Sequence, residues 1–140
     1  MRVVLDTDVL VAALRSDRGA SRQLVQAALR EKVVLLLSVP LVIEYEAVLT
    51  RPEQLEAIGA TREDVEAVVD ALVAVAQPVR LSFRWRPALA DPADDMVLET
   101  AVNGAADLLV TFNKRDFTAA RALFQVELVS PGEALTRLKE

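Results

Sequence analysis

Residues 2–8 read Arg-Val-Val-Leu-Asp-Thr-Asp, a short apolar run that ends in two carboxylates. An unbroken apolar run is typical of a strand buried on both faces, as in a parallel sheet. Further strands are expected at residues 33–37, 79–83, 107–111 and 126–129. Because segments of helical composition separate these strands, the sequence predicts an α/β fold.

The segments between the strands carry signals that begin and end helices. Residues 61–64 read Thr-Arg-Glu-Asp, a capping sequence, and apolar residues then recur at helical spacing as far as Val75. Other helices are expected over residues 9–14, 21–30, 38–50, 94–102 and 118–124, and from residue 130 onward. This alternation predicts a three-layer α/β/α sandwich with a central, mainly parallel sheet, formed by residues 1–140 as a single domain.

The composition excludes several kinds of chemistry. The 140 residues include no cysteine and no histidine, which excludes thiol catalysis, a histidine general base and the usual zinc sites. Sixteen basic and 21 acidic residues give a net charge of −5, which argues against holding nucleic acid by bulk positive charge. Since no apolar run is long enough for a membrane span and the N-terminus lacks the layout of a secretory signal, we expect a soluble, cytoplasmic protein.

Polar side chains gather where two predicted strands end, the edge of a parallel sheet at which ligands bind. Asp6 and Asp8 close the first strand, and a helix cap needs only one of them. Asp6 is therefore interpreted as a functional residue, whereas Asp8 either caps the helix or supports the site. Asn113 and Asp116 follow the strand over 107–111, although an ordinary turn also uses these residue types.

Two further acids lie near the beginnings of predicted helices. Glu44 is one turn into the helix after the second strand, a place where an acid often only compensates the helix dipole. Asp95 is left over once Asp91 is assigned as a helix cap and Asp94 as dipole compensation. Spacing alone does not decide whether Asp95 is functional or merely solvated.

Carboxylates that come together raise each other's pKa unless a cation screens them. In a chain without histidine or cysteine, Mg²⁺ or Mn²⁺ bound through oxygen fits this residue set. Such an ion activates water for in-line hydrolysis of a phosphodiester and neutralises phosphate charge. It would also supply the attraction for nucleic acid that the net charge of the chain does not.

The ordered set of motifs resembles the PIN domain family, in particular its VapC-like branch of toxin ribonucleases. The resemblance rests on DTDVL at residues 6–10, VIEYEAVL at 42–49 and DPADDMVLETAVNGAADLLVTFNKRDF at 91–117, together with the lengths between them. It implies an α/β/α domain that holds Mg²⁺ or Mn²⁺ and cleaves RNA. It also implies a toxin that is neutralised by a protein antitoxin and that often forms a homodimer.

By position, the resemblance makes Asp6, Glu44 and Asp95 the principal metal ligands. The fourth acidic position of the family matches Asn113, which brings an oxygen atom but no charge. Several interpretations stay open: three carboxylates suffice, Asp116 takes part, or metal affinity is reduced. Asp8, which stands where the family often has Asn or Ser, is a further candidate metal ligand that would restore the missing charge.

Two other functions are compatible with the same residues. An Asp-x-Asp sequence after a strand also occurs in phosphatases that use an aspartate nucleophile, a role that Asp6 would fill. Such an enzyme needs a lysine placed to neutralise the phosphate, and the chain has only Lys32, Lys114 and Lys139. A regulatory module would instead hold a cation in the acidic pocket without turnover, and metal would then stabilise it without hydrolysis.

Overall fold

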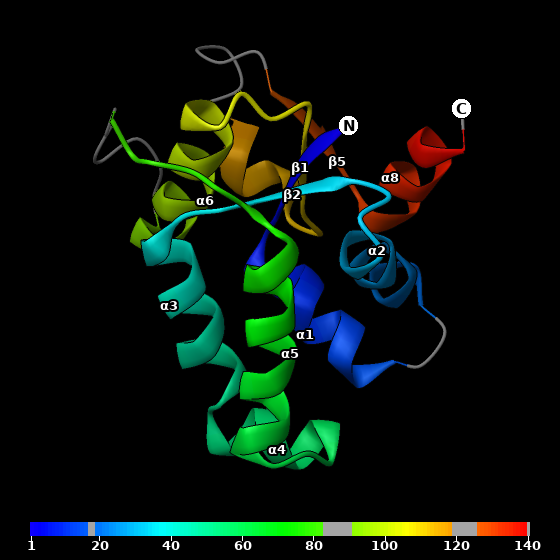
Figure 1. Cartoon of the computed structure of the whole chain (residues 1–140), viewed down its shortest axis with the longest axis vertical. Helices are drawn as coiled ribbons and strands as arrows, with labels where there is room; N and C mark the ends of the chain where they lie inside the picture. The colour runs from blue at the N-terminus through cyan, green and yellow to red at the C-terminus, as the bar shows by residue number, and fades with distance from the viewer. Residues whose placement is uncertain (17–18, 83–90, 119–125, 140) are drawn as a thin grey trace.

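The centre of the fold is a five-stranded sheet, described here from a computed structural model that covers residues 1–16, 19–82, 91–118 and 126–139 (Figure 1). The strand order is β3-β2-β1-β4-β5, and every pairing is parallel. The strands are β1 (Arg2–Leu5), β2 (Val34–Leu37), β3 (Gln77–Pro78), β4 (Leu108–Val110) and β5 (Glu127–Val129). The sheet predicted from the apolar runs is therefore confirmed.

Helices cover both faces of this sheet, which gives the three layers that the sequence predicts (Figure 1). Helix α6 contacts β1, β2 and β4 on one face of the sheet. Helix α8 contacts β4 and β5 and packs against α2. Helix α2 packs in turn against α1 and α5. The helices are α1 (Thr7–Arg15), α2 (Ala20–Leu29), α3 (Val39–Leu49), α4 (Pro52–Ile58), α5 (Arg62–Val75), α6 (Pro92–Asn103) and α8 (Pro131–Leu138), with a 3-10 turn η1 at Lys114–Phe117. Within the described ranges, no helix is long and apolar enough to cross a membrane.

The core lies between these layers and is centred on β1 and β4. Val3, Val4 and Leu5 are fully buried, as are Leu109 and Val110 on the neighbouring strand. These unbroken apolar strands require cover on both faces, and the two helical layers provide it. Burial of the central strands thus follows directly from their sequence.

Some predicted boundaries are wrong in informative ways. The strand predicted over 79–83 is in fact β3, because α5 ends at Val75 and the chain reaches β2 two residues earlier. The backbone N–H of Val79 still donates to the carbonyl of Leu37 at 2.8 Å. Residues 80–82 form no strand, and residue 83 lies outside the described ranges. The helix predicted over 118–124 also lies outside them, apart from Thr118. Helix α4 was not predicted.

The strand order places a topological switch point between β1 and β4. Chain connections from β1 lead outward to β2 and β3, whereas β4 and β5 lie on the other side of β1. Connections that diverge in this way leave a crevice at the carboxyl ends of the two strands, where ligands of such folds bind. Leu5 pairs with Val110, so the segments that follow β1 and β4 leave the sheet side by side.

Candidate metal centre

Asp6 lies at the carboxyl end of β1 and is fixed by three hydrogen bonds. Its backbone N–H donates to the carbonyl of Val110 at 2.9 Å. Its Oδ1 accepts from the backbone N–H of Thr7 at 2.8 Å and so caps α1, and its Oδ2 accepts from the hydroxyl of Thr111 at 2.7 Å. With 7% of its surface exposed, the Asp6 carboxylate has a defined position at the switch point.

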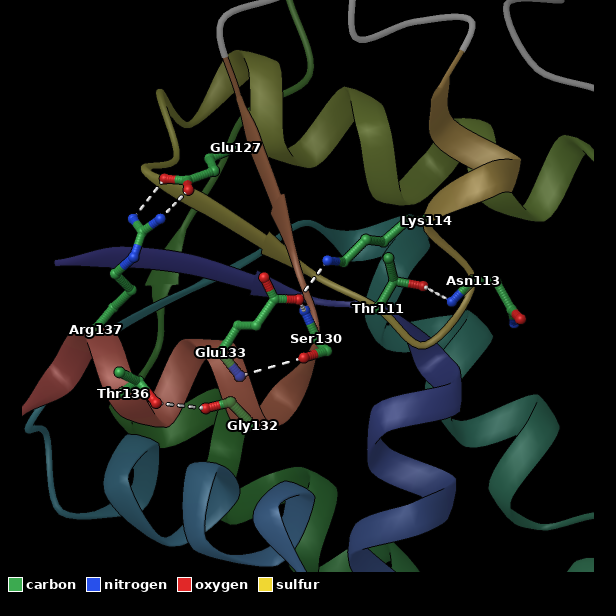
Figure 2. A network of polar contacts seen from close by, with 9 residues as sticks. All are labelled: Thr111, Asn113, Lys114, Glu127, Ser130, Gly132, Glu133, Thr136 and Arg137. Atoms are coloured by element: carbon green, nitrogen blue, oxygen red, sulfur yellow. Dashed lines mark hydrogen bonds and ion pairs between the residues drawn. The ribbon is translucent and has the colours of Figure 1, made fainter.

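Thr111 joins the segments that follow β1 and β4. Its backbone N–H continues the sheet by donating to the carbonyl of Val129 at 2.9 Å. Its fully buried hydroxyl donates to Asp6 and accepts from the backbone N–H of Asn113 at 3.0 Å (Figure 2). A single hydroxyl therefore orients both the first carboxylate and the turn that follows β4.

Asp8 lies in the first turn of α1 and faces the same turn. Its Oδ2 accepts from the backbone N–H of Phe112 at 3.2 Å and from the side-chain amide of Asn113 at 3.1 Å. Its Oδ1 is buried and has no hydrogen-bond partner among the described residues. Because an unsatisfied buried carboxylate oxygen is costly, this atom indicates a place for a positive partner.

The carboxylates of this region repel one another. Burial is the main cause that raises the pKa of Asp6, and the charge of Asp116 adds to it. Burial and then the charge of Asp6 raise the pKa of Asp8 to about 7. Burial raises the pKa of Asp94 to about 7 as well, with contributions from Asp6, Asp91, Asp116 and Asp8. These mutual effects define an acidic cluster, which consists of Asp6, Asp8, Asp94 and Asp116.

Asp94 is the member of the acidic cluster that the sequence reasoning missed, since it was assigned to dipole compensation alone. It lies in the first turn of α6, after Asp91 has capped the helix by accepting from the backbone N–H of Ala93 at 2.9 Å. Asp94 shares a helix face with Leu98 and Ala101, both of which are buried. Asp95 and Glu99 are also buried, at 2% and 1% exposed, so burial along α6 does not by itself single out Asp94.

Two further predicted ligands, Glu44 and Asp95, lie on α3 and α6. Asp95 is only 2% exposed and lies next to Asp94 in the first turn of α6. Glu44 is half-buried on α3 and forms no hydrogen bond or ion pair with the described residues. Its neighbour Tyr45 donates a hydrogen bond to the carbonyl of Leu5, and burial and then the charge of Asp6 raise the pKa of Tyr45 well above its ordinary value. This turn of α3 is thus close to the site, and the roles of Glu44 and Asp95 as ligands stay predictions.

The residues present fit a hard divalent cation. Carboxylate oxygens supported by a hydroxyl and an amide form the donor set that Mg²⁺ and Mn²⁺ prefer, and a cation would relieve the repulsion and satisfy Oδ1 of Asp8. Among residues 1–16, 19–82, 91–118 and 126–139, no three acidic side chains already converge closely enough to hold one ion. Binding of one ion by three of these carboxylates would therefore require them to be drawn together.

Lys114 is the lysine nearest in sequence to the predicted site, and it is engaged elsewhere. Its Nζ pairs with Oε1 of Glu133, which also accepts from the backbone N–H of Ser130 at 3.1 Å (Figure 2). The hydrogen bond from Lys114 is the main cause that lowers the pKa of Glu133 to about 2. The pair joins η1 to the beginning of α8, so Lys114 is not directed at Asp6 as an aspartate-nucleophile phosphatase would need.

Comparison with known proteins identifies the class to which this fold and site belong. A family model described as PIN domain matches residues 2–115, and the chain therefore belongs to the PIN domain family. This confirms the resemblance drawn from the motifs.

Two solved structures are similar in fold to the chain. One is VapBC2 from Rickettsia felis bound to a promoter DNA fragment, with 13% identity, a TM-score of 0.63, and coverage of 93% of this chain and 98% of that chain. The other is FitAB bound to an IR36 DNA fragment, with 17% identity, a TM-score of 0.58, and coverage of 92% and 94%. No curated protein matches the chain.

Proposed function

We propose that this chain is a metal-dependent endoribonuclease that acts in the cytoplasm as the toxin of a toxin–antitoxin pair. The observation that carries the proposal is the acidic cluster at the switch point of a PIN domain. Members of this family are typically nucleases, which supports a hydrolase that acts on phosphodiester bonds. We propose further that the phosphodiester it hydrolyses is that of RNA.

In this proposal Asp6, Asp8 and Asp94 hold Mg²⁺ or Mn²⁺, and Asp116 adds negative charge at the rim. A divalent ion held by these residues would supply positive charge for the scissile phosphate and lower the pKa of the attacking water. Asp6 contributes a fixed anchor because Thr7 and Thr111 each take one of its lone pairs and leave the others free. Glu44 and Asp95 remain proposed ligands, directly or through water.

The partners proposed for the chain are RNA, a protein antitoxin and a second copy of itself. The two similar structures are VapBC and FitAB complexes on DNA, which supports an antitoxin partner. A homodimer is supported by exposed apolar side chains on α3 and α5, namely Val39, Ile43 and Val73. Such a contiguous patch is typical of a protein–protein contact.

The first test is cleavage of an unstructured RNA in the presence of Mn²⁺. We expect the wild-type chain to cleave, EDTA to abolish cleavage, and Asp6→Asn to lower the rate about 100-fold or more, because charge stabilisation in the transition state is lost. Asp70→Asn is the matched control, since Asp70 is an exposed aspartate on α5. It should cleave like the wild type.

The contradicting results are equally specific. Equal rates for the wild type and Asp6→Asn, or no cleavage of any of several RNA sequences, would rule out this nuclease activity. Stabilisation by Mn²⁺ without any cleavage would instead indicate a cation-binding regulatory module.

A further inference from the structure

Asp8 and Asn113 form a hydrogen-bonded carboxylate–amide pair across the switch point. The Nδ2 of Asn113 donates to Oδ2 of Asp8 at 3.1 Å, although the two residues are 105 positions apart in the chain. The backbone N–H of Phe112 donates to the same oxygen at 3.2 Å. The turn after β4 thus occupies one oxygen of Asp8, and the other, Oδ1, is buried with no hydrogen-bond partner among the described residues.

This geometry fixes the part that Asn113 plays. An ionised carboxylate only accepts hydrogen bonds, so Asn113 has to present its NH₂ group to Asp8. An amide nitrogen in that role does not bind a cation. Instead, it holds Asp8 in one orientation, in the way that outer hydrogen bonds orient the ligands of a metal.

We propose that Asn113 is the positioning residue for Asp8 at the metal centre, and that the centre needs one carboxylate in this hydrogen-bonded pair, whichever of the two positions carries it. The inference rests on the proposed function only in requiring a divalent cation at the acidic cluster. Asp and Asn have the same shape, and here they lie at hydrogen-bond distance from each other. The pair is therefore exchangeable: Asp8→Asn combined with Asn113→Asp keeps one carboxylate, one amide and the hydrogen bond between them.

The test is the affinity for Mn²⁺, measured by calorimetry together with the thermal unfolding midpoint in EDTA and in Mn²⁺. We expect Asp8→Asn to weaken Mn²⁺ binding at least tenfold and to raise the midpoint in EDTA, because it replaces a buried carboxylate whose Oδ1 has no partner among the described residues with a neutral amide. Asn113→Ala should weaken Mn²⁺ binding about tenfold through loss of orientation. The exchanged double variant should bind Mn²⁺ within about threefold of the wild type.

Opposite changes in EDTA and in Mn²⁺ separate loss of a ligand from a failure to fold. Asp70→Asn, the exposed aspartate of α5, should change neither quantity. The inference would be overturned if Asp8→Asn bound Mn²⁺ as tightly as the wild type, or if the wild type bound no Mn²⁺. The exchange of the two residues would be overturned if the double variant bound Mn²⁺ as weakly as Asp8→Asn.

The outcome is separable from that of the nuclease test. If the wild type binds Mn²⁺ and the pair behaves as expected but no RNA is cleaved, the nuclease proposal fails and the inference stands. If RNA is cleaved while Asp8→Asn binds Mn²⁺ like the wild type, the inference fails and the nuclease proposal stands.

Discussion

Asp94 is the residue at which the repulsion within the acidic cluster is most easily measured. Its pKa of about 7 in the folded protein lies well above the value of 3.8 for an ordinary aspartate. Between these pH values the folded state retains a proton that the unfolded state has lost, so the free energy of unfolding falls as the pH rises. The stabilising contribution is complete below about pH 4 and is lost by about pH 7.

We therefore predict that Asp94→Asn stabilises the metal-free protein at pH 7.5 but not at pH 4. After allowance for solvent screening at this half-buried site, the gain should be about 1–2 kcal/mol. Urea unfolding in EDTA at both pH values provides the measurement, and Asp70→Asn is the control. The electrostatic interpretation would be wrong if the variant were destabilised at pH 7.5 or changed equally at the two pH values.

The residues of the acidic cluster differ in how well the sequence predicts them. The place of Asp6 at the end of β1 could be predicted from the strand pattern, but its role as the cap of α1, which the sequence analysis left to Asp8, could not. The interaction of Asp94 with the other carboxylates could not be predicted, because adjacent residues of a helix differ by only 100° and the direction of the sheet from α6 is a tertiary property. The Asp8–Asn113 hydrogen bond was equally inaccessible, since it depends on the register between β1 and β4.

At the scale of elements, Gly104 lets the end of α6 approach the sheet closely. A Cβ atom there would lie 2.9 Å from Leu36 Cδ1, Val79 Cγ2 and the carbonyl oxygen of Thr100. The carbonyl of Gly104 also accepts hydrogen bonds from the guanidinium of Arg2, at 2.6 and 3.1 Å, which ties α6 to β1. Because α6 carries Asp94, this contact helps to set the position of the acidic cluster.

We predict that Gly104→Ala destabilises the protein by about 1–3 kcal/mol through overpacking. Gly132→Ala in α8 is the matched control: its Cβ meets only Ser130 Oγ, at 4.0 Å, and alanine should be neutral or stabilising by up to about 1 kcal/mol. The urea midpoint of Gly104→Ala should fall below that of the wild type. The midpoint of Gly132→Ala should stay at the wild-type value or rise. An unchanged midpoint for Gly104→Ala would contradict the close contact.

Elements differ in how well their boundaries could be predicted. Helix α5 was anticipated because its capping box is local: Thr61 and Asp64 each bond the other's backbone N–H. The predicted position of β3 was wrong by two residues because the strand is only two residues long and pairs with the carboxyl end of β2, at Leu36 and Leu37. Such a short strand is defined by its partner rather than by its own sequence.

For the whole molecule, the decisive property is that sequence-distant segments meet at one edge of the sheet. Local patterns predict an α/β chain, but the order β3-β2-β1-β4-β5 is what brings the turn after β4 next to Asp6 and Asp8. Among the residues that the structure describes, apolar side chains on the outer surface of α3 and α5 stay exposed. Val39 is 73% exposed and Ile43 is 60% exposed.

This outer surface contains an apolar groove of about 230 Å³, lined by Leu37, Ser38, Val39, Val42, Ile43, Val73, Ala76 and Pro78. We predict that a second copy of the chain covers it, because burying these side chains removes apolar area from water. Light scattering coupled to size exclusion should give a dimer for the wild type and for Ala57→Arg, an exposed site on α4. Ile43→Arg should shift the protein to monomer at the same concentration, since it places an unpaired charge in the contact. A wild type that stays monomeric at high concentration, or an Ile43→Arg variant that stays dimeric, would show that the copies do not associate through this groove.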